Sequence, residues 1–181
     1  MKKTVNANEA IEMLRAGNAS YITSLTMRGD VSPETRERTC REGQSPYAVI
    51  LTCSDSRVIP EAIFSAGIGE LFVIRAAGNV VDEIVLGSIE YAVDHLGCEL
   101  VVVLGHTHCG AVDAAIHHEP GGHVKVIKDK IKPAVGGVTD GDSACALKVK
   151  NSVGEIIRAG VGDAVIIGAV YDIECGEVKF L

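Results

Sequence analysis

The stretch LVVVLGHTHCG, residues 100–110, decides the fold. Its first half, Leu100–Leu104, is an uninterrupted apolar run, which is typical of a strand covered on both faces. His106 and Cys109 follow directly, and a helix is predicted over 111–118. A buried strand, a short loop and a helix form the repeating unit of a parallel sheet. The stretch therefore predicts an α/β fold with two potential metal ligands at the carboxyl end of a strand.

Apolar runs of the same kind recur on both sides of this stretch. They predict strands at 47–52, 71–74 and 164–170, separated by predicted helices that include 82–96 and a helix near 145–159. The tail, 171–180, is expected to pair as an edge strand after the Cys175-Gly176 turn. This alternation predicts a mostly parallel sheet flanked by helices, with right-handed crossovers.

Residues 1–43 are predicted to form an N-terminal helical arm, and residues 44–181 the α/β core of the same single domain. Val5–Leu25 has the spacing of an amphipathic helix, with Gly17-Asn18 expected to stop it before a second short helix. The polar stretch 28–43 separates this helix from the core. Two interpretations are open: the helix packs on a neighbouring subunit, or it packs on its own core.

Composition narrows the class of function. The 181 residues are 47% hydrophobic and 23% charged, as expected of a globular chain long enough to bury a sizeable core. A formal net charge of −7 argues against nucleic acid and anionic membranes as partners. We expect a cytoplasmic protein, because the chain shows neither a signal peptide nor an apolar run of roughly 18 residues. The six cysteines need no disulfides beside such a core.

A second cluster of polar residues follows the predicted strand 47–52, in the stretch CSDSR of residues 53–57. Cys53, His106 and Cys109 together offer two thiols and an imidazole, which are ligands that Zn²⁺ prefers. The carboxyl ends of parallel strands meet at one edge of a sheet, where sites form in such folds. The three residues are therefore predicted to bind zinc together, provided that their two strands are neighbours.

The fourth coordination position of the metal is predicted to be filled by either Asp55 or water. Asp55 precedes Arg57 by two residues, so both side chains point the same way if the strand extension continues. A carboxylate beside a guanidinium forms a bidentate ion pair when it can. Asp55 is therefore expected to bind either zinc or Arg57, and in the second case water takes the fourth position. Two thiolates make zinc a weaker Lewis acid than three imidazoles, so we expect activity to rise with pH.

The paired motifs CSDSR and HTHCG resemble those of the β-class carbonic anhydrases. The resemblance covers nearly all of the chain from about Asn8. Further blocks that resemble the family are GQSP at 43–46, GELFVIR at 69–75, GSIEYAV at 87–93 and GAVYDI at 168–173.

The resemblance implies a function and a set of site residues. The function is zinc-dependent reversible hydration of carbon dioxide to bicarbonate and a proton by a zinc-bound hydroxide, with one zinc per subunit. By this resemblance, Cys53, His106 and Cys109 would bind zinc, and the dyad of Asp55 and Arg57 would position the zinc-bound hydroxide or let Asp55 close the site. Gln44 and the Gly110 amide would form hydrogen bonds with the substrate. Phe72 and Tyr91 would form an apolar wall around it. The family is at least dimeric, so we expect a homodimer or tetramer in which a partner supplies part of the wall and the N-terminal arm crosses to the neighbour.

Other functions stay open at this point. The same scaffold can hydrolyse carbonyl sulfide or carbon disulfide. A noncatalytic zinc-bound assembly protein would have Asp55 permanently closing the metal, but it would need neither Arg57 nor Gln44. His108, His117 and His118 are possible proton shuttles, and none is assigned. The lysines at 125, 128, 130 and 132 are expected on a solvated face.

Overall fold

The computed structural model describes residues 5–24, 26, 28–119 and 121–181, so Leu25, the predicted end of the first helix, lies outside the described residues. A five-stranded sheet has the order β2-β1-β3-β4-β5. Its strands are β1 (Ala48–Thr52), β2 (Leu71–Arg75), β3 (Leu100–His106), β4 (Val165–Tyr171) and β5 (Val178–Phe180). All neighbours are parallel except β5, which runs antiparallel to β4. The predicted sheet and its edge strand are confirmed.

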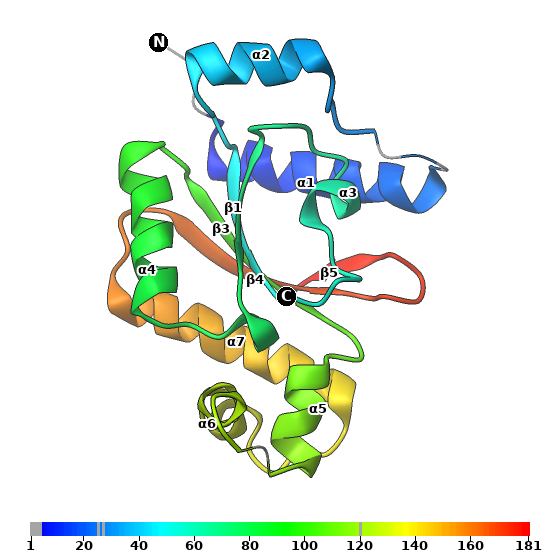
Figure 1. Ribbon diagram of the computed structural model, residues 1–181, viewed down its shortest axis with the longest axis vertical. Helices are drawn as coiled ribbons and strands as arrows, with labels where there is room; N and C mark the ends of the chain where they lie inside the picture. The colour runs from blue at the N-terminus through cyan, green and yellow to red at the C-terminus, as the bar shows by residue number, and fades with distance from the viewer. Residues whose placement is uncertain (1–4, 25, 27, 120) are drawn as a thin grey trace.

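Helices cover both faces of the sheet (Figure 1). They are α1 (Ala7–Thr23), α2 (Pro33–Glu42), α3 (Pro60–Ile63), α4 (Glu83–Glu90), α5 (Gly110–His117), α6 (Val124–Val135) and α7 (Gly141–Ala159), with a 3-10 turn η1 (Ala77–Asn79) and a π-helical turn η2 (Tyr91–His95). Alternate residues of each strand point to opposite faces. One face packs on α1 and α3, for example through Ile50, and the other packs on α4 and α7, for example through Leu51. The sheet is thus the middle of three layers.

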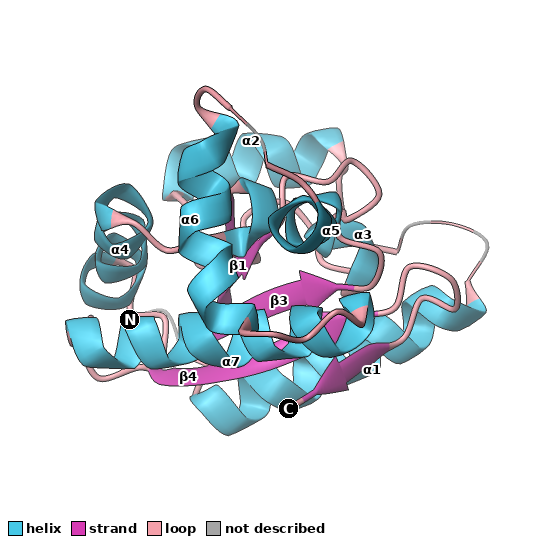
Figure 2. Ribbon diagram, turned by 90° about the horizontal axis from the view of Figure 1, so that it is seen from below, coloured by secondary structure: helices cyan, strands magenta, loops and turns pink. Residues whose placement is uncertain are grey.

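A third apolar cluster lies beyond the carboxyl ends of the strands. It joins α5, α6 and the start of α7 to the residues that follow β1. Figure 2 looks at this end of the molecule, with α5 and α6 in front of the sheet. The cluster includes Cys53 and Cys109, so it positions the predicted metal ligands.

The N-terminal segment differs from the prediction in two ways. First, α1 continues through Gly17 and Asn18, so the expected stop there is wrong. Gly17 lets the helix lie against the carbonyl oxygen of Phe64, which a Cβ would overlap. The Asn18 side chain donates to the carbonyl of Gly176 at 2.9 Å and accepts from the amide of Val178 at 2.9 Å. These residues fasten the helix to the sheet and do not end it.

Second, the polar stretch 28–43 contains the helix α2, which begins at the Ser32 cap and Pro33. Of the two interpretations of the first helix, packing on its own core is confirmed, because Ala10 and Leu14 are fully buried there. A contact of α1 with a partner stays a prediction, as does the division of the domain at residue 43.

The lysine cluster is not simply solvated. Lys128 is 5% exposed and forms an ion pair with Glu119. The ammonium of Lys130 donates to the carbonyl of Val81 at 2.8 Å. Both lie on α6, a helix whose apolar residues pack on the third cluster, so the expected solvated face is wrong for part of the set.

None of the helices in the described part of the chain has the length and apolar character needed to cross a membrane. The expected cytoplasmic location stays a prediction.

Candidate metal centre

The predicted ligands come together at the carboxyl ends of β1 and β3. The two strands pair directly, with Thr52 opposite Leu104, so Cys53 and His106 are brought side by side. Cys109 follows in the loop that enters α5. The ligand atoms of these three residues all lie within 4.8 Å of one another, and all three residues are buried. The expected juxtaposition is confirmed.

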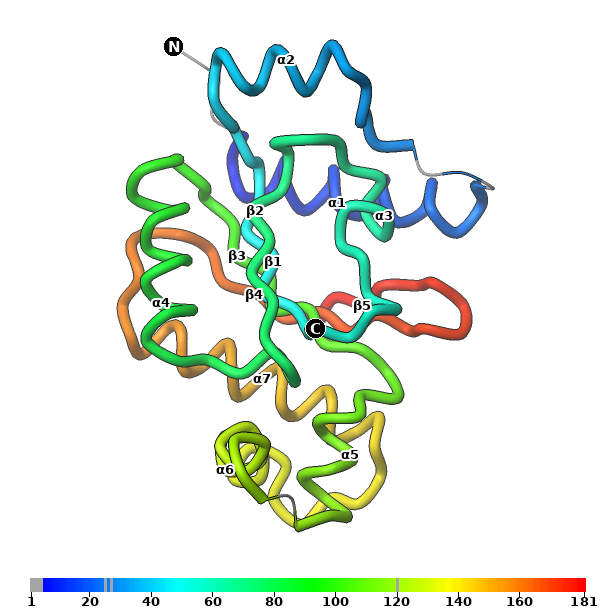
Figure 3. The backbone as a smooth tube through the Cα atoms, viewed as in Figure 1, coloured from blue at the N-terminus to red at the C-terminus, as the bar shows by residue number. Residues whose placement is uncertain are grey.

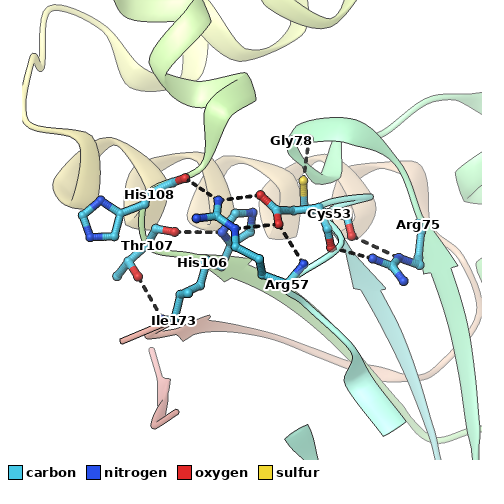
Figure 4. Close-up of polar contacts among 9 residues, drawn as sticks. Cys53, Arg57, Arg75, Gly78, His106, Thr107, His108 and Ile173 are labelled. Carbon is cyan, nitrogen blue, oxygen red and sulfur yellow. Dashed lines mark hydrogen bonds and ion pairs between the residues drawn. The ribbon is translucent and has the colours of Figure 1, made fainter. Parts of the chain in front are cut away.

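His106 offers a free nitrogen to this group. Its Nδ1 contacts the carbonyl oxygen of Thr107 at 2.8 Å (Figure 4), which accepts a hydrogen bond, so Nδ1 carries a proton, and in the neutral ring Nε2 keeps its lone pair. Nε2 is buried and has no hydrogen-bond partner among the described residues. Because most buried polar atoms in proteins have hydrogen-bond partners, an orphaned imidazole nitrogen beside two thiols fits a bound metal. The donor set fits Zn²⁺.

The two thiols share one proton. The hydrogen bond from the Cys109 thiol lowers the pKa of Cys53 to about 4, helped by His106 and by the Gly78 amide, whose nitrogen lies 3.2 Å from Cys53 Sγ. The same bond raises the pKa of Cys109. Metal binding requires both thiols as thiolates. A cation would therefore replace the shared proton and relieve the repulsion between two buried charges.

Asp55 and Arg57 form the predicted bidentate ion pair. Arg57 Nε lies 2.9 Å from Asp55 Oδ1, and Nη2 lies 2.7 Å from Oδ2. These hydrogen bonds hold the pKa of Asp55 well below its usual range. The expected strand extension is wrong, however, because the chain turns here. The amide of Val58 donates to the Asp55 carbonyl, and the Arg57 amide donates to Oδ1.

In this conformation Asp55 is engaged by Arg57 and does not belong to the three-residue ligand group. Of the two partners predicted for Asp55, the structure has the ion pair with Arg57. Arg57 Nη2 also donates to the carbonyl oxygen of His108 at 3.1 Å, a contact visible in Figure 4. Arg57 thus connects the two motif loops as well as holding the carboxylate.

Sequence reasoning missed Arg75 and Gly78 as parts of the site. Arg75 ends β2 opposite Thr52, and its guanidinium donates to the carbonyl oxygens of Cys53 at 3.2 Å and Asp55 at 2.7 Å. Arg75 therefore fixes the backbone of the loop that carries the first ligand. Its signal in the sequence was an arginine at the end of an otherwise apolar strand. Gly78 gave no such signal, because its contribution is a backbone amide.

A polar cavity of about 380 Å³ adjoins one of the predicted metal ligands, Cys109. Its lining includes Cys109 and Gly110 together with His108 and Asp113. Gly110 is the first residue of α5, where backbone amides are free to donate. The predicted neighbour of the substrate oxygens thus lies beside the ligands and next to open space.

The remaining predicted site residues lie elsewhere in the chain. Gln44 is exposed and precedes β1, whereas Cys53 follows it, so the length of the strand, about 17 Å, separates them. Phe72 is the second residue of β2 and packs on Tyr91, with ring centroids 6.1 Å apart. Tyr91 follows α4, which runs back from the carboxyl end of β2 toward the start of β3 (Figure 3). The structure does not bring these three residues to the metal ligands of the same chain.

Comparison with known proteins gives consistent results. A family model described as carbonic anhydrase matches residues 48–178. The chain is 37% identical to "Carbonic anhydrase 2" of Mycobacterium tuberculosis, over 95% of this chain and 91% of that protein.

Two solved structures share the fold. A Coccomyxa beta-carbonic anhydrase in complex with acetazolamide is 27% identical, with a TM-score of 0.73, over 82% of this chain and 78% of that chain. One of two tetrameric beta-carbonic anhydrases from Sordaria macrospora is 26% identical, with a TM-score of 0.71, over 82% of this chain and 87% of that chain.

Proposed function

The chain belongs to the β-class carbonic anhydrase family and is a carbonic anhydrase, and on this premise we propose that it hydrates carbon dioxide reversibly at one zinc ion per subunit, held by Cys53, His106 and Cys109. The observation that carries the proposal is the buried His106 Nε2, which has no partner among the described residues, in a ring that offers a nitrogen within 4.8 Å of both thiols. When bound, zinc supplies Lewis-acid activation of a water molecule.

We propose that Asp55 orients that water. Its carboxylate stays ionised because the guanidinium of Arg57 holds its pKa low. Oδ1 already accepts from both the Nε and the amide of Arg57. Oδ2 accepts from Nη2 and has a second lone pair, so Asp55 can accept a hydrogen bond from water through Oδ2 while it is paired with Arg57. Arg57 in turn keeps Asp55 from closing the metal's fourth position. A purely structural zinc site would need neither residue.

We further propose that a second copy of the chain completes the site. Gln44, Phe72 and Tyr91 lie too far from the metal ligands of their own chain to contact carbon dioxide there. Phe72 lies on β2, the edge strand of the sheet in the described part of the chain, and Tyr91, which packs on Phe72, is 48% exposed. An exposed apolar group beside an edge strand favours contact with another chain. The Sordaria macrospora relatives are tetrameric, which supports a homodimer or tetramer here.

The outer face of α4 supports the same contact. Ile84 is 78% exposed, and it shares a helix face with Tyr91 by their spacing. Gly87 lies between them and has open space around the position of a Cβ. Glycine inside a helix costs about 1 kcal/mol relative to alanine. A glycine on this face is explained if the backbone of a partner approaches closely.

Stopped-flow measurement of carbon dioxide hydration across pH, with zinc content determined on the same sample, tests the proposal. We expect about one zinc per chain and a rate that rises from mildly acidic to alkaline pH, because the reacting water must lose a proton. A fully zinc-loaded protein that is inactive toward carbon dioxide would contradict the proposal. Assays with carbonyl sulfide and carbon disulfide belong beside it, since a strong preference for either would assign the site to those substrates.

A further inference from the structure

The helix α7 buries a lysine that the reaction does not use. Lys148 is 1% exposed and donates from Nζ to the hydroxyl of Ser152, one turn later and fully buried. No carboxylate among the described residues lies within ion-pair distance of Lys148. Burial lowers the pKa of Lys148 to about 8, so the side chain still carries a proton at neutral pH. A buried ammonium without a carboxylate is costly, and this cost calls for a role.

The Lys148–Ser152 pair leads to the metal centre. Ser152 Oγ donates to the carbonyl oxygen of Asn79 at 3.4 Å. Asn79 is the last residue of the turn η1, and Gly78 of the same turn donates its amide to Cys53 Sγ at 3.2 Å. A continuous set of contacts therefore connects the buried ammonium to a thiolate that would bind zinc.

The turn η1 needs to be held from outside. Gly78 and Asn79 both adopt left-handed conformations, with φ of 64° and 42°, and such a conformation costs a non-glycine residue like Asn79 about 1 kcal/mol or more. The side-chain nitrogen of Asn79 is buried with no partner among the described residues. Gly78 is packed so tightly that a Cβ would lie 2.6 Å from Ile131 of α6. The turn is thus clamped between α6 and the Lys148–Ser152 pair of α7.

We propose that Lys148 is a positioning residue for the metal centre: through Ser152 and the Asn79 carbonyl it fixes the turn that keeps the Gly78 amide on Cys53 Sγ. The inference rests on the proposed zinc site. An amide hydrogen bond orients a metal-bound thiolate, and its loss leaves that ligand held less firmly in place. When zinc is bound and Cys109 is a thiolate, the ammonium also interacts favourably with its charge, so it would offset part of the negative charge gathered at the site.

The test compares Lys148→Met with Lys150→Met, a control on the same helix in which an exposed lysine is changed in the same way. Each purified protein is loaded with Co²⁺, and the thiolate-to-cobalt charge-transfer absorption is recorded. The release of zinc to a chelator is timed at neutral pH. We expect K148M to shift the charge-transfer band and to release zinc about tenfold faster, as for other groups that orient metal ligands. K150M should match the wild type in both.

Ser152→Ala provides a second route, because it removes the hydroxyl link and leaves the lysine in place. If K148M does not fold, S152A is expected to show the same spectral shift, and an unchanged spectrum there overturns the inference. A K148M protein with the cobalt spectrum and zinc release of the wild type, but a lower Tm, also overturns it, because Lys148 would then serve stability alone. Neither readout uses a substrate. A wild-type protein that binds cobalt but does not hydrate carbon dioxide therefore contradicts the proposed reaction, and the spectra still decide the role of Lys148.

Discussion

The metal ligands and the proposed substrate wall lie at opposite ends of the same sheet. Cys53 and His106 lie where β1 and β3 end, and one chain brings them together with Cys109. Gln44 lies before β1, and Phe72 near the start of β2 packs on Tyr91. The first region is complete within one chain, whereas the second faces outward. The comparison teaches that one chain brings the proposed metal ligands together, whereas the proposed substrate wall would need a partner to enclose the substrate.

The largest expected effect is the loss of zinc binding and activity when a metal ligand is replaced. Cys53→Ser should abolish zinc binding and activity, because a buried serine is a poor zinc ligand and the remaining pair of ligands is too few. The wall residues should stay folded as before. Metal analysis, stopped-flow assay and circular dichroism check this. Cys98→Ser is the matched control, since Cys98 is also buried but only donates to the Pro46 carbonyl. Retention of zinc by C53S would contradict the assigned ligand set.

The next largest effect is expected when Arg57 is replaced, and it separates metal binding from catalysis in the metal region. Arg57→Ala should keep zinc but lower kcat/KM about 100-fold, the upper range for groups that orient a metal site. Without the guanidinium, Asp55 is free to close the fourth metal position. Arg57→Lys should recover only part of the rate, because an ammonium cannot form the bidentate pair. Full activity in R57A would show that Asp55 needs no partner to leave the metal open.

An experiment that mixes two variants tests whether the substrate wall comes from a partner chain. Gln44→Ala leaves the metal region intact, and C53S leaves the wall intact, so each variant alone should have low activity. If the wall comes from a partner, one site in each mixed dimer is complete. Co-expression with random pairing should then restore about a quarter of the wild-type activity per chain. Activity equal to the mean of the two separate preparations would show that each chain encloses its own substrate.

The sequence predicted which residues form the metal region. It predicted less well the backbone geometry that holds these residues in place. Apolar runs located the strands, and the motif at the end of each strand located Cys53, His106 and Cys109, because parallel order alone brings strand ends together. The motif also predicted the Asp55–Arg57 pair, although a turn and not a strand extension brings the two side chains together.

Contacts between distant segments were not predictable in the same way. Asn18 has the composition of a helix stop, yet it fastens α1 to residues more than a hundred positions away. Lys148 falls on the buried face of α7 by its spacing with Val149 and Ser152. That spacing was the one available sign that Lys148 is buried. It does not reveal the proposed support of the turn η1, which lies about 70 residues earlier in the chain.

The smallest expected effect is on the free energy of unfolding. Its pH dependence distinguishes a substitution in the metal region from one in the wall region. The folded-state pKa of Asp55 lies below its unfolded value near 4. The ion pair therefore stabilises the folded chain above pH 4, and this contribution is lost as the pH falls further toward the folded-state pKa. Because half of the Arg57 side chain is exposed, solvent screening limits the contribution to about 1 kcal/mol.

Asp55→Asn should accordingly be less stable than the wild type in urea unfolding at pH 7, and the difference should shrink as the pH is lowered below 4. The measurement is best made on metal-free protein, so that zinc release does not contribute. Gln44→Ala is the control from the wall region, because it changes no charge and its difference from the wild type should not vary with pH. A D55N difference that persists unchanged to pH 2 would mean that the carboxylate charge does not hold the two motif loops together. The metal region would then owe its shape to Arg75 and its backbone contacts.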